Sequence, residues 1–137
     1  MEFPVFTTIK MVKGEDLNHH GTLFAGRTAE WFVESGFIAA ASMTKPDNIV
    51  CLKIHGMTFT RPINKGDLPV FTSRIVLTGR TRLVAYIEVK NKGELVIRGF
   101  ISFIHVDASG KPLPHGLVFE PKTEEEKALY AEAQTLS

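Results

Sequence analysis

The chain has 137 residues, of which 44% are hydrophobic and 23% are charged. This size and composition favour one compact globular domain over residues 1–137 and argue against two domains. With 16 Lys and Arg residues against 15 Asp and Glu residues, the net charge of +1 gives no general attraction for nucleic acid.

The first third of the chain predicts a strand followed by one long helix. Residues 4–12 mix β-branched and aromatic residues and predict a strand, which ends at the polar loop 13–16. From residue 22 to residue 44 the chain is rich in Ala, Leu, Phe, Trp and Met and has no proline, which favours a long helix that Pro46 ends. Because this helix is apolar around most of its circumference, we expect other structure to wrap it.

Four runs of strand-forming residues follow the helix, at residues 48–61, 68–78, 82–90 and 94–106. The short turns between them predict antiparallel neighbours. In the third run apolar and polar residues alternate, so one face of the sheet meets the helix. In the first run the apolar phase changes after Ile54, which predicts a β-bulge at Gly56. A capping-box pattern at Thr123 and Glu126 predicts a final helix over residues 123–135.

A strand, a long buried helix and four antiparallel strands together predict an α+β fold in which a sheet wraps a helix. Such a fold leaves an edge strand open. The strand predicted at 48–61 begins with the alternating apolar residues Val50, Leu52 and Ile54. We therefore expect this strand to pair with its counterpart in a second copy of the chain.

Two features of the sequence favour the cytoplasm. The longest strongly apolar stretch, Trp31 to Met43, is broken by Glu34 and Ser35 and is shorter than the ~20 residues of a membrane span, so we expect no membrane partner. The first residues lack the positive segment and apolar core of a secretory signal, and Cys51 is the only cysteine, so no disulfide within the chain can form.

The densest cluster of unusual residues lies where a polar loop enters the helix, in the segment Asn18-His19-His20-Gly21-Thr22-Leu23-Phe24-Ala25-Gly26. Unpaired N–H groups point outward from the first turn of a helix, and the helix dipole adds about half a positive charge, so an anion or a polarised carbonyl oxygen is stabilised there. Ala25 and Gly26 leave room for a substrate. Asn18 has a structural alternative, because asparagine in a loop more often shapes the turn.

Glu34 is the best catalytic candidate in the chain. It lies about two turns further along the helix, inside an apolar segment. An ionised carboxylate is costly there unless it forms an ion pair or takes part in catalysis. The alternative is a solvated stripe, because Arg27, Glu30 and Glu34 have the spacing i, i+3 and i+7 of one salt-bridged helix face.

The histidines favour no metal site. For the adjacent pair His19 and His20, capping or loop hydrogen bonds are the commoner role, and no third ligand stands at helical or hairpin spacing. His55, His105 and His115 form no recognisable motif. We therefore expect no metal.

The segment 18–26, followed by Glu30-Trp31-Phe32-Val33-Glu34, resembles the signature of hotdog-fold acyl-CoA thioesterases. The likeness continues through the segments 59–63, 65–67 and 79–81 and the turn at 107–114, and it covers almost the whole chain. The resemblance implies a five-stranded antiparallel sheet around the central helix and dimers with a continuous ten-stranded sheet. It also implies assembly of the dimers into a tetramer or a hexamer.

The resemblance further implies hydrolysis of acyl-CoA to a free acid and coenzyme A. The thioester carbonyl would lie against the N–H of Gly26 or Ala25, and Glu34 would act as general base on water or attack directly. Asn18, from the neighbouring subunit, would hold the water or the carbonyl. Because a thiolate is a good leaving group, one carboxylate and an oxyanion site suffice, and no Ser-His-Asp triad is expected. We expect no cofactor other than the coenzyme A of the substrate.

Further substrate contacts are expected from two groups of residues. The first group belongs to the helix entry and consists of His19, His20, Thr22, Phe24 and Ala25. The second group lies near strand ends, where it could meet the phosphates of coenzyme A, and consists of Arg61, Lys65, Arg80, Thr81 and Arg82. Ordinary surface charge is an equal alternative for each basic residue.

The chain departs from the family pattern at one position. Many similar enzymes carry the catalytic Asp or Glu nine residues after the position of Phe24, which here is Val33, and Glu34 is one residue later. One residue rotates a side chain by about 100° around a helix, so Glu34 does not simply inherit the role.

Two alternatives stay open. One is a hydratase or dehydratase that uses His20 with Glu34, although a His-Phe-Pro-Gly type of motif is absent. The other is a non-catalytic protein that binds acyl-CoA.

Overall fold

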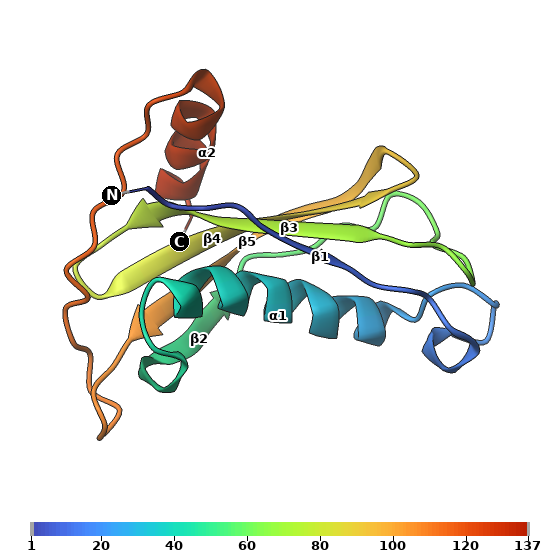
Figure 1. Ribbon diagram of the computed structural model, residues 1–137, viewed down its shortest axis with the longest axis horizontal. Coiled ribbons are helices and arrows are strands. Elements are labelled where there is room, and N and C mark those ends of the chain that lie inside the picture. The colour runs from blue at the N-terminus through green and yellow to red at the C-terminus, as the bar shows by residue number, and fades with distance from the viewer. Residues whose placement is uncertain (1, 137) are drawn as a thin grey trace.

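The computed structural model describes residues 2–136. In chain order the elements are β1 (Phe6–Ile9), η1 (Gly14–Asp16), α1 (Ala25–Ser42), η2 (Pro46–Asn48), β2 (Ile49–Ile54), β3 (Val70–Thr78), β4 (Arg82–Asn91), β5 (Glu94–His105) and α2 (Glu124–Gln134), where η1 and η2 are short 3₁₀ helices. The five strands form one antiparallel sheet in the order β1-β3-β4-β5-β2. α1 lies along one face of the sheet, and α2 sits on the opposite face at one end (Figure 1). The predicted α+β fold, with a sheet wrapped around a long helix, is confirmed.

The alternation in β4 decides which side chains face α1. Four alternating residues of this strand are completely buried in the main core: Leu83, Ala85, Ile87 and Val89. Phe32 of α1, also completely buried, packs in the same core. Gly36 lets the helix approach the sheet closely, because a Cβ at this position would lie 3.1 Å from the side chain of Ile87. Burial of each large apolar side chain stabilises the fold by about 1.5–3 kcal/mol.

α1 begins later than the sequence predicts. Thr22 and Leu23 form β-bridges to Asn64 and Leu17, which keeps them extended, so the helix starts at Ala25. Within residues 2–136, no helix combines the length and the apolar character needed to cross a membrane.

β2 is shorter than the strand predicted at 48–61. It ends at Ile54, and its bulge lies at Leu52, where the register against β5 shifts, rather than at Gly56. Gly56 has a positive φ of 124° and sets its carbonyl oxygen against Gly99 of β5. A Cβ on Gly99 would collide with this oxygen, so the path that the chain takes out of the sheet depends on a glycine at position 99.

β2 forms an open edge of the sheet. It pairs with β5 on one side, and β5 is its single neighbour in the strand order. Every residue of β2 after Ile49 is exposed, and Val50, Leu52 and Ile54 are 48%, 58% and 50% exposed. An open edge that carries large apolar side chains is a template for pairing with another chain.

α2 starts at the predicted capping box and packs on the outer face of the sheet. The Thr123 side chain accepts a hydrogen bond from the N–H of Glu126, and the Glu126 side chain accepts one from the N–H of Thr123. Leu129 and Ala133 of the helix pack in a second, smaller cluster with Val76, Val84, Tyr86 and Phe100.

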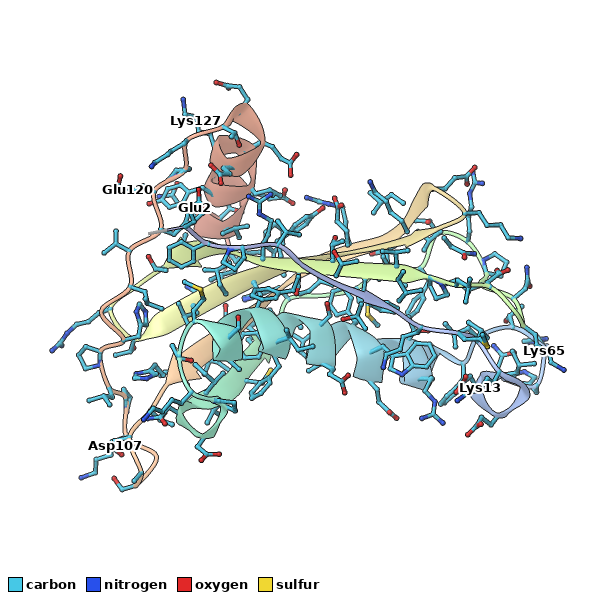
Figure 2. All side chains as sticks on the ribbon, viewed as in Figure 1. Glu2, Lys13, Lys65, Asp107, Glu120 and Lys127 are labelled. Carbon is cyan, nitrogen blue, oxygen red and sulfur yellow. The ribbon has the colours of Figure 1, made fainter. Side chains whose placement is uncertain are left out.

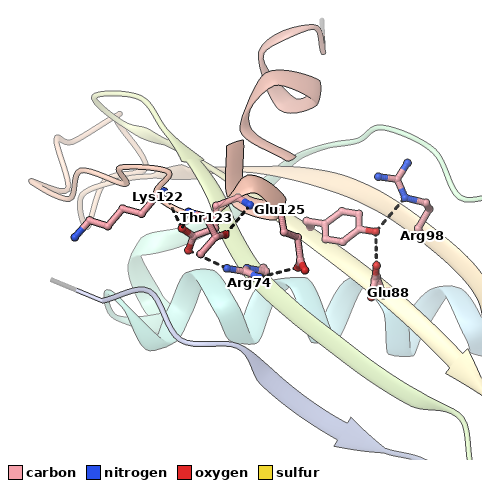
Figure 3. Close-up of polar contacts among 8 residues, drawn as sticks. Arg74, Glu88, Arg98, Lys122, Thr123 and Glu125 are labelled. Atoms are coloured by element: carbon pink, nitrogen blue, oxygen red, sulfur yellow. Dashed lines mark hydrogen bonds and ion pairs between the residues drawn. The ribbon is translucent and has the colours of Figure 1, made fainter. Parts of the chain in front are cut away.

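Two arginines of the sheet hold α2 through its carboxylates. Arg98 donates two hydrogen bonds, 2.8 and 2.9 Å long, to Glu132. Arg74 donates to Glu125 and to Glu126, each at 3.1 Å (Figure 3). The helix is therefore fastened to the sheet both by ion pairs and by apolar contacts.

We expect this attachment to weaken in acid. Hydrogen bonds from Arg98 lower the pKa of Glu132, and backbone hydrogen bonds at Thr123 and Lys122 lower the pKa of Glu126, both from an ordinary value of 4.5. A carboxyl whose pKa is lowered on folding contributes stability that is complete above the ordinary value and is lost as the pH falls through the lowered value. Amide protection factors of α2 should therefore fall as the pH is lowered from neutral to below about 4.5.

Arg98→Met is the control for this prediction, because it removes the partner of Glu132. In this variant the protection of α2 should already be reduced at neutral pH and should change less with acid. Protection factors of the parent chain that stay constant over the same range would contradict the prediction.

Candidate functional site

A pocket of about 300 Å³ opens where the loop before α1 meets the start of that helix. Its walls are Asn18, Thr22, Leu23, Ala25 and Thr28 on one side and Phe59, Thr60, Arg61, Pro62 and Ile63 on the other. Leu23 and Ile63 are buried and give it an apolar floor, whereas Phe59 and Arg61 are exposed at its rim. Figure 2 shows Lys13 and Lys65 at the end of the molecule where α1 begins and Asp107 at the far end.

Asn18 organises the loop that leads into α1. Its side-chain oxygen accepts hydrogen bonds from the N–H groups of His20, at 2.8 Å, and Thr22, at 3.2 Å. Its side-chain nitrogen donates to the Thr22 hydroxyl at 3.1 Å, and its backbone N–H donates to the Thr22 carbonyl at 2.7 Å. The turn-shaping role considered for Asn18 is therefore present, and the same side chain also lines the pocket.

The first turn of α1 supplies the donors expected of an oxyanion site. The N–H groups of Arg27 and Thr28 both donate to the carbonyl of Phe24, whereas those of Ala25 and Gly26 find no acceptor within residues 2–136. The N-cap residue, Phe24, adds no side-chain cap. Unpaired donors at a helix start bind anions and carbonyl oxygens, and Ala25 also lines the pocket.

The other candidate residues of the helix entry lie outside the pocket walls. The ring of Phe24 is half exposed and packs over Gly26, where any Cβ would collide with it. His19 and His20 are exposed, with ring centroids 3.9 Å apart. Nowhere in the described chain do three His, Cys, Asp or Glu side chains gather as ligands for a metal ion.

Glu34 does not reach this pocket in its own chain. It lies eight residues after Gly26, which is about 12 Å along a helix that rises about 1.5 Å per residue. Its side chain is 60% exposed, and its Oε1 atom lies 3.8 Å from Nζ of Lys10, which follows β1. Val33 is half buried and packs against the core. His20 precedes the helix and Glu34 lies in its third turn, so the pair that a hydratase would need is not formed within one chain.

Arg27 belongs in part to the salt-bridged stripe considered as the alternative for this helix. Its Nη1 atom lies 3.5 Å from Glu30, but its Nε atom lies 3.2 Å from Asp16, a residue that the sequence did not single out. Asp16 is only 4% exposed and also accepts the N–H of Lys13 at 2.9 Å. It thereby fastens the start of α1 to η1. Lys13 is not a residue type that caps a helix through its side chain, so no capping pattern in the sequence pointed to Asp16.

The predicted basic residues fall into two places. Arg61 lines the pocket, whereas Arg80, Thr81 and Arg82 lie at the turn between β3 and β4, at the opposite end of the sheet. Arg82 lies on the α2 face, where its guanidinium donates to the buried hydroxyl of Ser102 at 2.7 and 3.1 Å. Within one chain these residues do not form a single site with Arg61.

The chain is similar to known proteins in both sequence and fold. A family model described as the thioesterase superfamily matches residues 20–97, more than half of the chain, and the chain belongs to this superfamily. Among solved structures, a hexameric acyl-CoA thioesterase is 29% identical and superposes with a TM-score of 0.84, covering 95% of this chain and 86% of that one. The hotdog arrangement is thereby confirmed.

Two curated relatives are similar over most of the chain. The acyl-CoA thioester hydrolase YciA of Salmonella typhimurium is 30% identical over 111 residues, which cover 72% of this chain and 80% of the relative. YkhA of Bacillus subtilis, described as an uncharacterized acyl-CoA thioester hydrolase, is 27% identical over 121 residues, which cover 84% of this chain and 69% of the relative.

Proposed function

We propose that this chain hydrolyses acyl-CoA thioesters to a free acid and coenzyme A. The observation that carries the proposal is the pair of unpaired N–H groups at Ala25 and Gly26, next to a pocket with an apolar floor. A thioester oxygen that accepts from these groups is polarised, and the same donors stabilise the negative charge that develops on it in the transition state. The activity named for both curated relatives agrees with this assignment.

The remaining chemistry needs few groups. A thiol has a pKa of about 8.5, so the thiolate of coenzyme A leaves without strong acid assistance. The side chains of Asn18 and Thr22 at the pocket wall can hold a water molecule or the carbonyl. The proposed reaction therefore uses a water molecule and one base, with no metal and no cofactor besides the coenzyme A of the substrate.

We assign the base to Glu34 of a neighbouring protomer. Among the described residues that line the pocket there is no carboxylate and no histidine, and Glu34 of the same chain is about 12 Å from Gly26. A twofold axis through β2 would set two α1 helices antiparallel on one face of a joined sheet. In that arrangement the middle of one helix approaches the start of the other.

The same pairing would complete the contacts to coenzyme A. Antiparallel pairing of β2 with its copy reverses one sheet end to end, so the partner's turn between β3 and β4 comes to the end that holds this pocket. Arg80, Thr81 and Arg82 of one protomer would then meet the phosphates of a ligand in the other. We propose that such dimers assemble further into a hexamer, the form described for the hexameric relative.

Hydrolysis of a panel of acyl-CoAs, monitored by the release of free thiol, tests the proposed thioesterase activity and the assignment of Glu34 as base. Glu34→Gln should lower kcat by about a hundredfold with little change in KM, because loss of a general base costs about 10²–10⁴ in rate. Glu30→Gln, one turn earlier on the exposed side of α1, is the matched control and should stay within about threefold of the parent. If Glu34→Gln is as active as the parent chain, Glu34 is not the base.

A non-catalytic acyl-CoA-binding protein is the second candidate function. It is favoured by Val33, which packs against the core at the position where similar enzymes carry their acid. Calorimetric binding of coenzyme A, together with no thiol release from any acyl-CoA of the panel, would decide for this candidate.

A further inference from the structure

Arg61 is already paired with a carboxylate before any ligand arrives. Its Nη1 atom donates a hydrogen bond to Oε2 of Glu94, the first residue of β5. Both side chains are exposed, by 65% and 57%. Arg61 is the one charged side chain among the described residues that line the pocket, so Glu94 neutralises the charge that the pocket presents to a ligand.

The backbone fixes this ion pair at the mouth of the pocket. Thr60, the residue before Arg61, donates its N–H at 3.2 Å and its hydroxyl at 2.9 Å to the carbonyl of Val96. Val96 lies two residues after Glu94 on the same strand. The segment 59–63 is thus already joined to the start of β5, and the fold does not depend on the ion pair to hold the two together.

This sets the pair apart from the other arginine contacts. Arg98 and Arg74 fasten α2 to the sheet, and Arg27 fastens the start of α1 through Asp16. Among the described residues, the contacts of Arg98 and Arg74 are the only hydrogen bonds that join α2 to the sheet. The contact between Arg61 and Glu94 joins a segment and a strand that are already joined by Thr60, and it does so beside the proposed active site.

We propose that Glu94 is an intramolecular competitor for Arg61, which holds the guanidinium in the free protein and yields it to a phosphate of coenzyme A in the complex. This inference rests on the proposed function. A guanidinium binds carboxylate and phosphate oxygens with the same planar donor geometry, so one group can replace the other. An exposed ion pair contributes little free energy, and a phosphate carries the larger charge, so the exchange is favourable. Glu94 thereby raises the KM for acyl-CoA.

The experiment compares two thioesters of the same acyl group. One is the acyl-CoA, and the other is the acyl-N-acetylcysteamine, which has the thioester but no phosphate. Glu94→Gln keeps the size of the side chain and removes its charge. In this variant we expect the KM for acyl-CoA to fall about threefold with kcat unchanged, and the KM for the N-acetylcysteamine thioester to stay the same. The difference in KM for acyl-CoA between the parent chain and Glu94→Gln should shrink as salt is added.

Arg61→Gln and Glu125→Gln complete the design. Arg61→Gln should raise the KM for acyl-CoA alone, and adding Glu94→Gln to it should change nothing further, because the competitor then has nothing to hold. Glu125→Gln removes an exposed carboxylate that pairs with Arg74, far from the pocket walls, and should leave both KM values unchanged.

The Kd for coenzyme A, measured by calorimetry, separates this inference from the proposed function. It should be about threefold lower for Glu94→Gln than for the parent chain, whether or not a thioester is hydrolysed. Absence of hydrolysis by the parent overturns the proposed function and leaves this comparison intact. Equal Kd values for the parent and Glu94→Gln, or a KM that changes equally for both thioesters, overturns the role of Glu94.

Discussion

Replacement of Ala25 by proline should lower kcat by about a hundredfold to a thousandfold and leave the fold intact, because loss of one oxyanion donor costs about 10²–10³ in rate. Ala25 is the first residue of α1, the helical position where proline is well tolerated. Phe24 before it already has a ψ of 131°, the extended conformation that a residue before proline requires. The substitution therefore removes one N–H and changes little else.

The measurement is thiol release at saturating acyl-CoA, with thermal unfolding of the same sample to show that the helix has formed. Ala25→Gly keeps the N–H, removes only the methyl group and should stay within about threefold of the parent in kcat. If Ala25→Pro retains the parent kcat, the carbonyl does not use this N–H, and the unpaired amide at Ala25 is simply the end of a helix.

Local chemistry explains the parts of the fold that the sequence predicted. The strands β3, β4 and β5 follow from alternating apolar residues, since one buried face requires a period of two. The turn between β4 and β5 follows from Lys92-Gly93, where both residues take positive φ values, 54° and 80°. The unpaired N–H groups at the start of α1 were likewise expected from a loop that enters a helix at small residues. Their role as an oxyanion site stays a prediction.

The parts that the sequence did not predict depend on contacts between residues far apart in the chain. β2 ends at Ile54 because Gly56 meets Gly99, a contact that no periodicity in either segment reveals. Glu34 lies beside Lys10. The sequence did not predict this placement, because a helix that is apolar around most of its circumference does not indicate which side faces which strand.

The separation of Arg82 from the pocket had a signal in the sequence. Arg82 stands in the phase of β4 that alternates with the buried residues Leu83 and Ala85, so its side chain belongs to the face of the sheet away from α1. A site that includes both Arg82 and the start of α1 therefore requires residues from two protomers.

Leu52→Lys should convert the protein to monomers and abolish acyl-CoA hydrolysis. Leu52 is 58% exposed in the middle of the open edge β2, and a twofold interface places each substitution in both copies. Two like charges set close together across paired strands, in place of two apolar side chains, should weaken association by about 2–4 kcal/mol, or about thirtyfold to a thousandfold in Kd. Sedimentation over a range of protein concentrations measures this change.

Ile9→Lys is the matched control, because Ile9 is 61% exposed on β1, the strand at the other edge of the sheet. This variant should keep the dimer and its activity. A parent chain that sediments only with the mass of one protomer would exclude pairing through β2. A monomeric Leu52→Lys variant that still hydrolyses acyl-CoA would show that each chain carries a complete site, and the base would then have to be sought within the chain that binds the thioester.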